Sequence, residues 1–404
     1  MKILHIVGGS STNGAFKGAA ILHKGLLKHN IKSKILSDTR ISKNFKNDNN
    51  IISIKSNFKN IIFNKFFILI EKILKFIYLH SPRDSFTIGL FGFDITNFKA
   101  FKEADIIHIH WLSQGFINLK SLSKINKPVI WTMRDMWAFC GGPHYTMDFQ
   151  KYENTKVSRF LEKIKKKYYK KNFKFVAVSD WLKTKAEKSF VLKNHKVIKI
   201  NNNIDFNNFT QIHKEEAKKI LKINTKKNII LYGAQNPQSA RKGWNYFVDS
   251  LKKLNKEKYF LLIFGNFWSE KKLNEVGIEY KSLGFINDNK QLNAIYACAD
   301  IFVASSIQDA WPKTFAEAMA CGTPVVCFEN TSISEIVDHK INGYVVKNID
   351  SQELSVGIEW LIEELKINKS LKAAAILKAS NYDTKKIALE YIRLYKRVIN
   401  TKFK

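Results

Sequence analysis

A chain of 404 residues is longer than one ordinary hydrophobic core supports, so its length predicts two domains. Its residues are 45% hydrophobic and 13% aromatic, which excludes a disordered or low-complexity protein. The formal charge of +32 suits nucleic acid, an anionic membrane surface or phosphorylated small molecules, or else it follows from the Lys-, Asn- and Ile-rich composition of an AT-rich genome.

The N-terminal sequence MKILHIVGG predicts a short strand followed by a glycine turn. Its apolar stretch is too short for a cleaved signal, and no small-residue cleavage site follows it. The four cysteines are scattered, without the spacing of a zinc site or of a redox pair, as expected of free thiols in a reducing compartment. We therefore expect a cytoplasmic protein.

Residues 58–80, FKNIIFNKFFILIEKILKFIYLH, form the most apolar stretch of the chain. Lysines and a glutamate interrupt it, so no uncharged run reaches the roughly 18 residues of a membrane-spanning helix. The stretch predicts a helix that either packs within the first domain or lies on a membrane surface. A basic segment at 159–174 predicts either a solvated helix face or a contact with an anionic bilayer.

Short apolar runs alternate with amphipathic helical stretches, which is the pattern of βαβ units and parallel sheets. An Asn-rich, exposed linker at 199–210 is expected to separate the halves into domains of residues 1–203 and 204–382. A final amphipathic helix, 383–402, has no strand after it and can pack back onto the first domain or onto the second. The predicted strands are 2–8, 104–112, 128–135 and 174–180 in the first domain and 228–234, 259–266, 299–306 and 324–328 in the second.

Two carboxylates flank a Trp-Pro turn in the second domain. Asp309 follows a predicted strand, and Glu317 lies on a helix that begins at Pro312 and ends at a Cys-Gly pair. The backbone N–H groups around Lys313 and Thr314 open that helix and offer a phosphate site. Carboxylates beside such a site fit a ligand whose sugar hydroxyls donate to them. The segment therefore predicts a nucleotide-sugar site, unless the two acids are only a turn former and an exposed helix residue.

The spacing Asp309-x7-Glu317, followed by AMACGTPVV, resembles the E-x7-E signature of family 4 glycosyltransferases, which have the GT-B fold. The resemblance implies an α/β protein of two Rossmann-like, doubly wound domains facing across a cleft. It also implies retaining transfer of a sugar from a nucleotide-diphosphate sugar to a glycan or polyprenyl-linked acceptor, as in bacterial O-antigen, capsule or exopolysaccharide synthesis. The other segments that carry it are 10–20, 105–112, 130–145, 176–182, 231–244, 284–306 and 342–346.

The resemblance assigns roles to residues of the second domain. It implies that Glu317 holds the ribose hydroxyls of the donor and that Asp309 stands for the first glutamate, which contacts the transferred sugar. Arg241 and Lys242 would face the diphosphate and stabilise the leaving charge, unless they are only solvated loop charges. Ala234 stands where many members carry an arginine, so Arg241 substitutes for it or the phosphate is held less firmly. The remaining implied donor-binding residues are Gly14, Lys17, Gly233, Gly265, Phe285, Ile286, Lys313 and Thr314.

The resemblance also implies an acceptor side in the first domain. Arg134 stands where many members have a histidine, and an arginine cannot shuttle protons at neutral pH, so only a charge-binding role stays open. The aromatic residues of the same loop suit stacking on a sugar; they are Trp131, Trp137, Phe139 and Tyr145. The implied acceptor-side residues are His110, Trp111, Arg134, Asp135, Trp137 and Tyr145.

Metal and cofactors are not expected. His108 and His110 share one face of a strand, but no nearby Asp, Glu or Cys completes a ligand set. The chain also has no Asp-x-Asp pair, so Arg, Lys and a helix dipole must balance the diphosphate charge.

The proposed mechanism is a front-face displacement, because no carboxylate is left to act as a covalent nucleophile. A nucleotide-sugar epimerase of the same fold is one alternative. A nucleic-acid-binding protein is another, although the basic residues are spread along the chain and no known nucleic-acid module is present. A polyprenyl-linked acceptor would bring the protein to the inner face of the cytoplasmic membrane. The sequence fixes neither the donor base, the sugar nor the acceptor.

Overall fold

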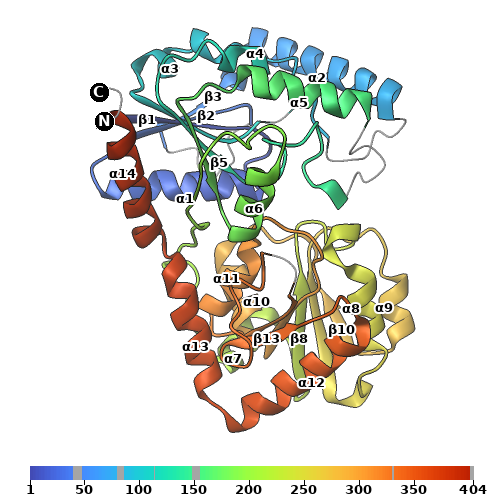
Figure 1. Ribbon diagram of the computed structural model, residues 1–404. Helices are drawn as coiled ribbons and strands as arrows, with labels where there is room; N and C mark the ends of the chain where they lie inside the picture. Colours follow the sequence, from blue (N-terminus) through green and yellow to red (C-terminus); the bar gives the residue numbers. More distant parts are fainter. Residues whose placement is uncertain (40–47, 80–85, 113, 148–154, 330–331, 401–404) are drawn as a thin grey trace. The chain divides into compact units, whose positions relative to one another are not determined.

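The computed structural model of the protein describes residues 1–39, 48–79, 86–112, 114–147, 155–329 and 332–400. The chain divides into two compact units, Met1–Asn202 with Thr384–Lys404 and Asn203–Asp383 (Figure 1). Each unit is an α/β layer structure around one parallel sheet. The predicted class of two Rossmann-like, doubly wound domains is therefore confirmed. Among the described helices, none combines the length and the apolar character needed to cross a membrane.

The sheet of the first unit has the strand order β3-β2-β1-β4-β5-β6-β7, and all its pairs are parallel. The chain runs outward from β1 to β3 and then returns to the other side of β1 with β4, so the direction of winding reverses between β1 and β4. The strands are β1 (Lys2–Val7), β2 (Lys32–Ser37), β3 (Ile51–Ser53), β4 (Ile106–Trp111), β5 (Val129–Met133), β6 (Phe173–Ala177) and β7 (Val197–Lys199). The helices are α1 (Gly14–Lys28), α2 (Phe58–Leu79), α3 (Lys99–Glu103), α4 (Leu119–Leu122), α5 (Lys156–Tyr168), α6 (Asp180–Lys188) and α14 (Thr384–Asn400).

The last helix, α14, belongs to the first unit and packs against α1. A Cβ atom at Gly25 would lie 2.8 Å from the Thr384 Cγ2 atom and 3.2 Å from the Ala388 Cβ atom, so this close approach of two helices requires glycine. Tyr391 and Tyr395 extend the contact into the sheet, where they bond to side chains of β4 and β5. Residues 401 and 402 of the predicted helix lie outside the described range.

The second unit repeats the design with the strand order β10-β9-β8-β11-β12-β13, again all parallel. Its winding reverses between β8 and β11. The strands are β8 (Asn228–Gly233), β9 (Tyr259–Phe264), β10 (Tyr280–Ser282), β11 (Ile301–Ala304), β12 (Val325–Phe328) and β13 (Gly343–Val346). The helices are α7 (Lys214–Leu221), α8 (Trp244–Leu251), α9 (Lys271–Val276), α10 (Asn289–Cys298), α11 (Lys313–Ala320), α12 (Ser351–Ile367) and α13 (Ser370–Ala379).

The stretch 199–210 is not the exposed linker that its composition predicts. Asn202, Asn203 and Ile204 are all buried. The Asn202 amide oxygen accepts a hydrogen bond from Arg134, and the Ile204 N–H donates to the Tyr382 carbonyl oxygen at 2.9 Å. The second contact joins the residues next to the two ends of the second unit, Asn203 and Asp383, so that unit is one continuous insertion with adjacent ends.

Helix α2 directs polar side chains toward the interior of the first unit. The buried Asn64 amide donates to the Gly115 carbonyl oxygen at 3.0 Å, and the Glu71 carboxylate accepts from the Gly89 N–H at 2.8 Å. Lys75 is buried one turn after Glu71. The prediction of a helix over 58–80 is confirmed up to Leu79, and residue 80 lies outside the described range.

Glu71 gives stability a pH dependence that can be measured. Burial, opposed by hydrogen bonds from Gly89 and Ile88 and by the charge of Lys75, raises the pKa of Glu71 to about 7. The folded state therefore holds this proton more tightly than the unfolded state. We expect Glu71 to make the free energy of unfolding fall by roughly 3 kcal/mol as pH rises from about 4.5 to about 7.

The substitution Glu71→Gln keeps an acceptor oxygen but removes the charge. Relative to wild type, this variant is expected to gain stability between pH 5 and pH 8 in urea unfolding. Glu187→Gln, at an exposed position of α6, serves as control. If Glu71→Gln and wild type keep a constant difference in stability across this range, Glu71 does not titrate in it.

Candidate active site

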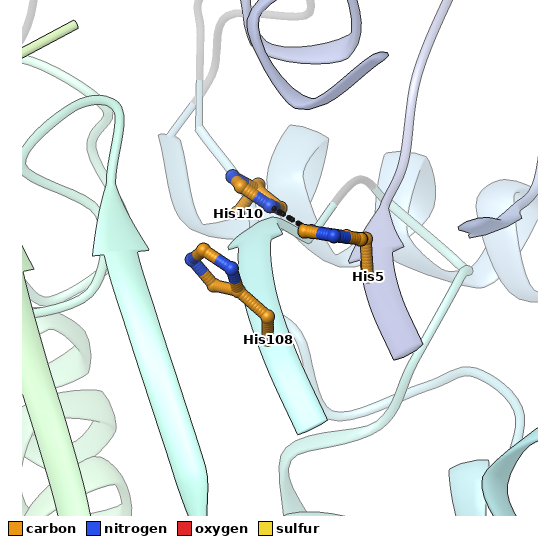
Figure 2. Close-up of side chains that lie close together, drawn as sticks. All are labelled: His5, His108 and His110. Atoms are coloured by element: carbon orange, nitrogen blue, oxygen red, sulfur yellow. Dashed lines mark hydrogen bonds between the residues drawn. The ribbon is translucent and has the colours of Figure 1, made fainter. Parts of the chain in front are cut away.

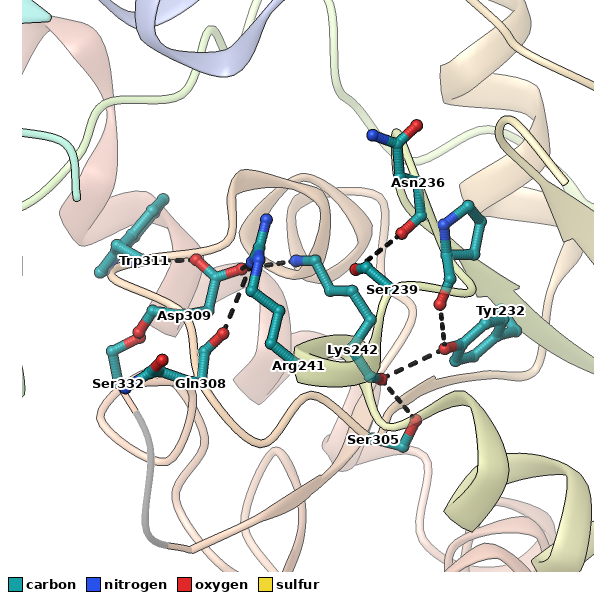
Figure 3. A network of polar contacts seen from close by, with 11 residues as sticks. Tyr232, Asn236, Ser239, Arg241, Lys242, Ser305, Gln308, Asp309, Trp311 and Ser332 are labelled. Atoms are coloured by element: carbon teal, nitrogen blue, oxygen red, sulfur yellow. Dashed lines mark hydrogen bonds and ion pairs between the residues drawn. The ribbon is translucent and has the colours of Figure 1, made fainter. Parts of the chain in front are cut away.

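A cluster of three charged side chains lies at the carboxyl edge of the second sheet, where its winding reverses (Figure 3). β8 and β11 are neighbours there, and the loops that follow them carry Arg241 with Lys242 and Asp309, respectively. The Asp309 Oδ2 atom lies 2.5 Å from the Lys242 Nζ atom and 3.3 Å from an Arg241 guanidinium nitrogen. The reversal point of a doubly wound sheet is where such folds bind ligands.

Asp309 is buried among cations, and its charge state follows from that. Burial alone would raise the pKa of its carboxyl group, but Lys242 and Arg241 outweigh burial and hold that pKa below its ordinary value. The Asp309 Oδ1 atom also accepts a hydrogen bond from the Trp311 N–H at 3.2 Å. Asp309 is therefore an anion that orients two cations, a contact that sequence reasoning did not assign to it.

Backbone contacts hold the two loops together and so fix the cluster. The Ile307 N–H donates to the Arg241 carbonyl oxygen at 2.8 Å, and the Ser305 hydroxyl donates to the Lys242 carbonyl oxygen at 3.0 Å. Gly243 has a φ angle of +67°, and a Cβ atom there would lie 1.8 Å from the Ser305 carbonyl oxygen. Only glycine permits this approach, which places the two cations on the same side as Asp309.

Glu317 lies on α11, one turn after Lys313. Its Oε2 atom accepts a hydrogen bond from the Tyr296 hydroxyl of α10 at 3.0 Å, and its Oε1 atom lies 3.8 Å from the Lys313 Nζ atom. The residue is only 8% exposed. Glu317 is thus a buried carboxylate whose position is fixed by Tyr296 and Lys313, and it is not an exposed helix residue. Burial together with Glu317 raises the pKa of Tyr296 well above its ordinary value, so its hydroxyl stays a donor.

The other predicted donor-binding residues fall into three groups. The two strand-end glycines have packing reasons of their own: a Cβ atom at Gly233 would lie 2.3 Å from the Phe264 ring, and one at Gly265 would lie 2.0 Å from the Ala234 carbonyl oxygen. Phe285, which is exposed, and Ile286, which is half-buried, lie between β10 and α10, whereas Lys313 and Thr314 lie in the first turn of α11. Gly14 and Lys17 lie in the first turn of α1, in the first unit.

On the predicted acceptor side, Trp111 at the end of β4 and Asp135 in the loop after β5 come together. The Trp111 indole N–H donates to the Asp135 Oδ2 atom at 2.8 Å. The same oxygen lies 2.6 Å from the His144 Nδ1 atom, and the Thr87 hydroxyl lies 2.9 Å from the His144 Nε2 atom. Sequence reasoning missed His144, although it falls in the quoted segment 130–145.

The structure contradicts the prediction that the aromatic residues of this loop form a surface for stacking on a sugar. Trp131, Trp137, Phe139 and Tyr145 are 1%, 2%, 3% and 9% exposed, so they pack in the core of the first unit and offer no ring face to a sugar. The Lys165 Nζ atom lies 3.8 Å from the Trp137 ring centre and covers that ring. The aromatic residues of this loop therefore belong to the hydrophobic core and do not form a ligand surface.

His110 belongs to a buried cluster of three histidines with His5 and His108 (Figure 2). The His5 Nδ1 atom lies 2.8 Å from the His110 Nε2 atom, and Arg134 donates to the His110 Nδ1 atom at 3.1 Å. Burial lowers the pKa of all three histidines well below the ordinary value, so they are neutral.

The three imidazoles are close enough to hold a metal ion, since one nitrogen of each lies within 4.8 Å of the others. Two contacts oppose that use. The Arg134 guanidinium beside His110 repels a second cation, and the hydroxyls of Tyr395 and Thr132 hydrogen-bond both nitrogens of His108 at 2.7 Å. The cluster instead ties α14 to the sheet.

Comparison with known proteins adds to this geometry. Residues 213–378, within the second unit, match the family model "Glycosyl transferases group 1". The chain is 28% identical over 242 residues to the N,N'-diacetylbacillosaminyl-diphospho-undecaprenol alpha-1,3-N-acetylgalactosaminyltransferase of Campylobacter jejuni. That match covers 57% of this chain and 63% of the relative, which is less than two thirds of its length.

Solved structures match over nearly the whole chain and show the fold. A glycosyltransferase from Rickettsia africae has a TM-score of 0.68 at 18% identity over 98% of both chains. Anabaena HepE in complex with UDP-glucose has a TM-score of 0.69 at 16% identity, over 98% of this chain and 100% of that one. The GT-B fold and the resemblance to bacterial glycosyltransferases are confirmed.

Proposed function

We propose that this chain, which has the GT-B fold and a second unit matching the group 1 glycosyltransferases, transfers a sugar from a nucleoside-diphosphate sugar with retention of anomeric configuration. The observation that carries the proposal is the cluster of Asp309, Arg241 and Lys242 at the reversal point of the second sheet. Two oriented cations beside a buried carboxylate suit a ligand that carries both a diphosphate and a hydroxyl-rich sugar.

The donor would be held by both carboxylates. Glu317 would accept hydrogen bonds from the ribose hydroxyls, with its position fixed by Tyr296. Asp309 would orient Arg241 and Lys242 toward the diphosphate and contact the sugar. The first turn of α11 would add its N–H groups to the same anion. A uridine nucleotide is the first candidate, because Anabaena HepE is known with UDP-glucose.

Transfer would follow a front-face displacement. The bond between the anomeric carbon and the donor phosphate oxygen breaks, the acceptor oxygen bonds to that carbon on the same face, and the acceptor proton passes to the departing phosphate oxygen. Lys242 and Arg241 stabilise the charge that develops there. Because protein cations and a helix N-terminus are in position for this task, we propose that the reaction needs no divalent metal or other cofactor.

The acceptor we propose is a glycan or a polyprenyl-linked saccharide of a bacterial surface polysaccharide. The Campylobacter relative acts, by its name, on an undecaprenol-linked acceptor, which supports a lipid-linked substrate here. Such an acceptor places the enzyme in the cytoplasm, at the inner face of the membrane.

A thermal-shift screen tests the donor proposal. Purified protein is heated with UDP, GDP, ADP, CMP and their sugar conjugates in the presence of EDTA. One nucleoside diphosphate is expected to raise Tm by several degrees, because a ligand at about 100 times its Kd stabilises the folded state by about 2.7 kcal/mol. A shift that appears only when a divalent metal replaces EDTA would refute metal independence.

Analysis of the product tests the reaction class. Incubation with the matching nucleotide sugar and a lipid-linked acceptor should give a new glycoside with the donor's anomeric configuration. An inverted linkage would rule out front-face displacement. A sugar epimerised while still attached to the nucleotide would instead identify an epimerase.

A further inference from the structure

The exposed face of α2 is apolar, which is unusual for a helix on the surface of a protein. Among the described residues, nine of the nineteen exposed large apolar side chains lie on this one helix, each at least half exposed. The other ten are scattered over both units. They are ordinary on a protein surface, whereas a contiguous apolar patch marks an interaction site. The nine are Phe58, Ile62, Phe63, Phe66, Leu69, Ile73, Phe76, Ile77 and Tyr78.

The inward contacts of α2 fix this orientation. Asn64 donates to the Gly115 carbonyl oxygen, and Glu71 accepts from the N–H groups of Ile88 and Gly89. A half-turn of the helix would break these bonds and leave buried polar groups without partners. A helix of a water-exposed surface has the opposite arrangement, with apolar residues toward the core. The apolar face of α2 is therefore held outward by the fold.

The charges around this face are positive. On α2, the exposed charged residues are Lys59, Lys65 and Lys72, and the single acid, Glu71, is buried. Helix α5 packs beside α2 through an apolar cluster that Leu74 of α2 shares with α5 (Figure 1). The exposed residues of α5 are Lys156, Arg159, Phe160, Lys163 and Lys167.

A groove of about 450 Å³ adjoins the same helix. Four phenylalanines line it, and two of them, Phe63 and Phe67, belong to α2. The Phe67 and Phe93 rings meet edge to face at 5.6 Å between centroids, and Phe98 follows at 6.2 Å from Phe93. Phe63 lines the groove and also belongs to the exposed face, so the groove continues that face inward. Asn60, Asp94 and Asn97 also line it, so the groove has an aromatic wall and a polar side.

We propose that α2 and α5 form a docking surface for an anionic phospholipid bilayer. Helix α2 lies in the plane of the interface with its apolar side chains among the acyl chains, and the lysines of α2 and α5 contact the lipid phosphates. Charge complementarity selects this partner over a second copy of the chain, because a symmetric dimer through α2 would bring the same lysines face to face. The surface is independent of the sugar that the second unit binds.

Vesicle co-sedimentation tests the proposal. The full-length protein is mixed with vesicles of phosphatidylcholine alone or with phosphatidylglycerol added. We expect binding to the anionic vesicles at least about tenfold tighter than to the neutral ones, and weaker binding as salt rises. The double substitution Phe66→Asp with Ile73→Asp should weaken binding at least about 100-fold, because two apolar side chains no longer enter the bilayer.

Two further variants test the contribution of the lysines to vesicle binding and its specificity for the α2 surface. Lys65→Glu with Lys72→Glu should remove most of the preference for anionic vesicles. Ile367→Asp with Leu377→Asp changes two side chains that are 80% and 72% exposed in the second unit, and it should bind vesicles like wild type. Thermal shifts with nucleoside diphosphates report on the second unit. If a variant no longer binds vesicles but its Tm still rises with the nucleotide, the substitution has affected the α2 surface alone.

Two results would overturn the proposal. One is equal binding of wild type and Phe66→Asp/Ile73→Asp to anionic vesicles. The other is a wild-type dimer in analytical ultracentrifugation that becomes monomeric in this variant while neither protein binds vesicles, which would make the face a contact between two copies.

Discussion

Replacing Lys242 by methionine is expected to lower kcat by about 10²- to 10³-fold, the usual cost of removing one group that stabilises charge in a transition state. The ammonium group lies 2.5 Å from Asp309 and shares that anion with Arg241. In the proposed reaction it faces the departing diphosphate, whose charge grows as the sugar leaves. Steady-state kinetics with a saturating donor would measure the loss in kcat, and calorimetry would measure the smaller loss in nucleotide affinity.

The control for this variant is Lys252→Met, at the exposed residue that follows α8 in the same unit, where the lysine pairs with Asp249. Asp309→Asn should also reduce kcat, because the two cations lose the anion that orients them. If Asp309 acts through Lys242, the double variant loses less activity than the product of the two single losses. A Lys242→Met enzyme with a wild-type kcat would show that the cluster is structural.

Replacing Glu317 by alanine should weaken binding of the donor nucleotide at least about 100-fold. The carboxylate would accept two hydrogen bonds from ribose hydroxyls, and hydrogen bonds to charged groups contribute about 1.5–3 kcal/mol each. The measurement compares calorimetric Kd values for the nucleoside diphosphate and its 2′-deoxy form. Wild type should prefer the ribose form clearly, whereas Glu317→Ala should bind both forms alike.

Tyr296→Phe is the matched control, because it leaves the carboxylate in place and removes only the hydroxyl that holds it. It should weaken binding less than Glu317→Ala and keep the preference for ribose. If Glu317→Ala still discriminates against the 2′-deoxy nucleotide as strongly as wild type, another residue holds the ribose.

Sequence reasoning placed Asp309 and Glu317 of the second unit's candidate site on the elements that the structure shows, because the signals for those elements are local. The position of Asp309 after a buried strand and of Glu317 on the next helix follows from residues within one βα unit. The pairing of Asp309 with Arg241 does not follow from the residues of any single βα unit. These residues are 68 positions apart and meet only because β8 and β11 are neighbours. Tyr296 was missed for the same reason, since its bond to Glu317 joins two helices.

The first unit was harder to predict for a different reason. Composition alone cannot separate an aromatic ligand surface from an aromatic core, so the buried Trp137 was expected to meet a sugar. The apolar and polar positions of α2 were visible, yet the side that faces the core depends on hydrogen bonds to Gly89 and Gly115, which lie far along the chain. Short strands at the sheet edges, such as β3 and β10, carried too few residues for a periodic signal.

The place of α14 has a consequence for synthesis on the ribosome. Tyr395 and Tyr391 hydrogen-bond side chains of β4 and β5, so the core of the first unit is complete only after α14 has left the ribosome. The second unit is one uninterrupted stretch, Asn203–Asp383, which precedes α14 in the chain. During translation the second unit can therefore close first, while the first waits for its last helix.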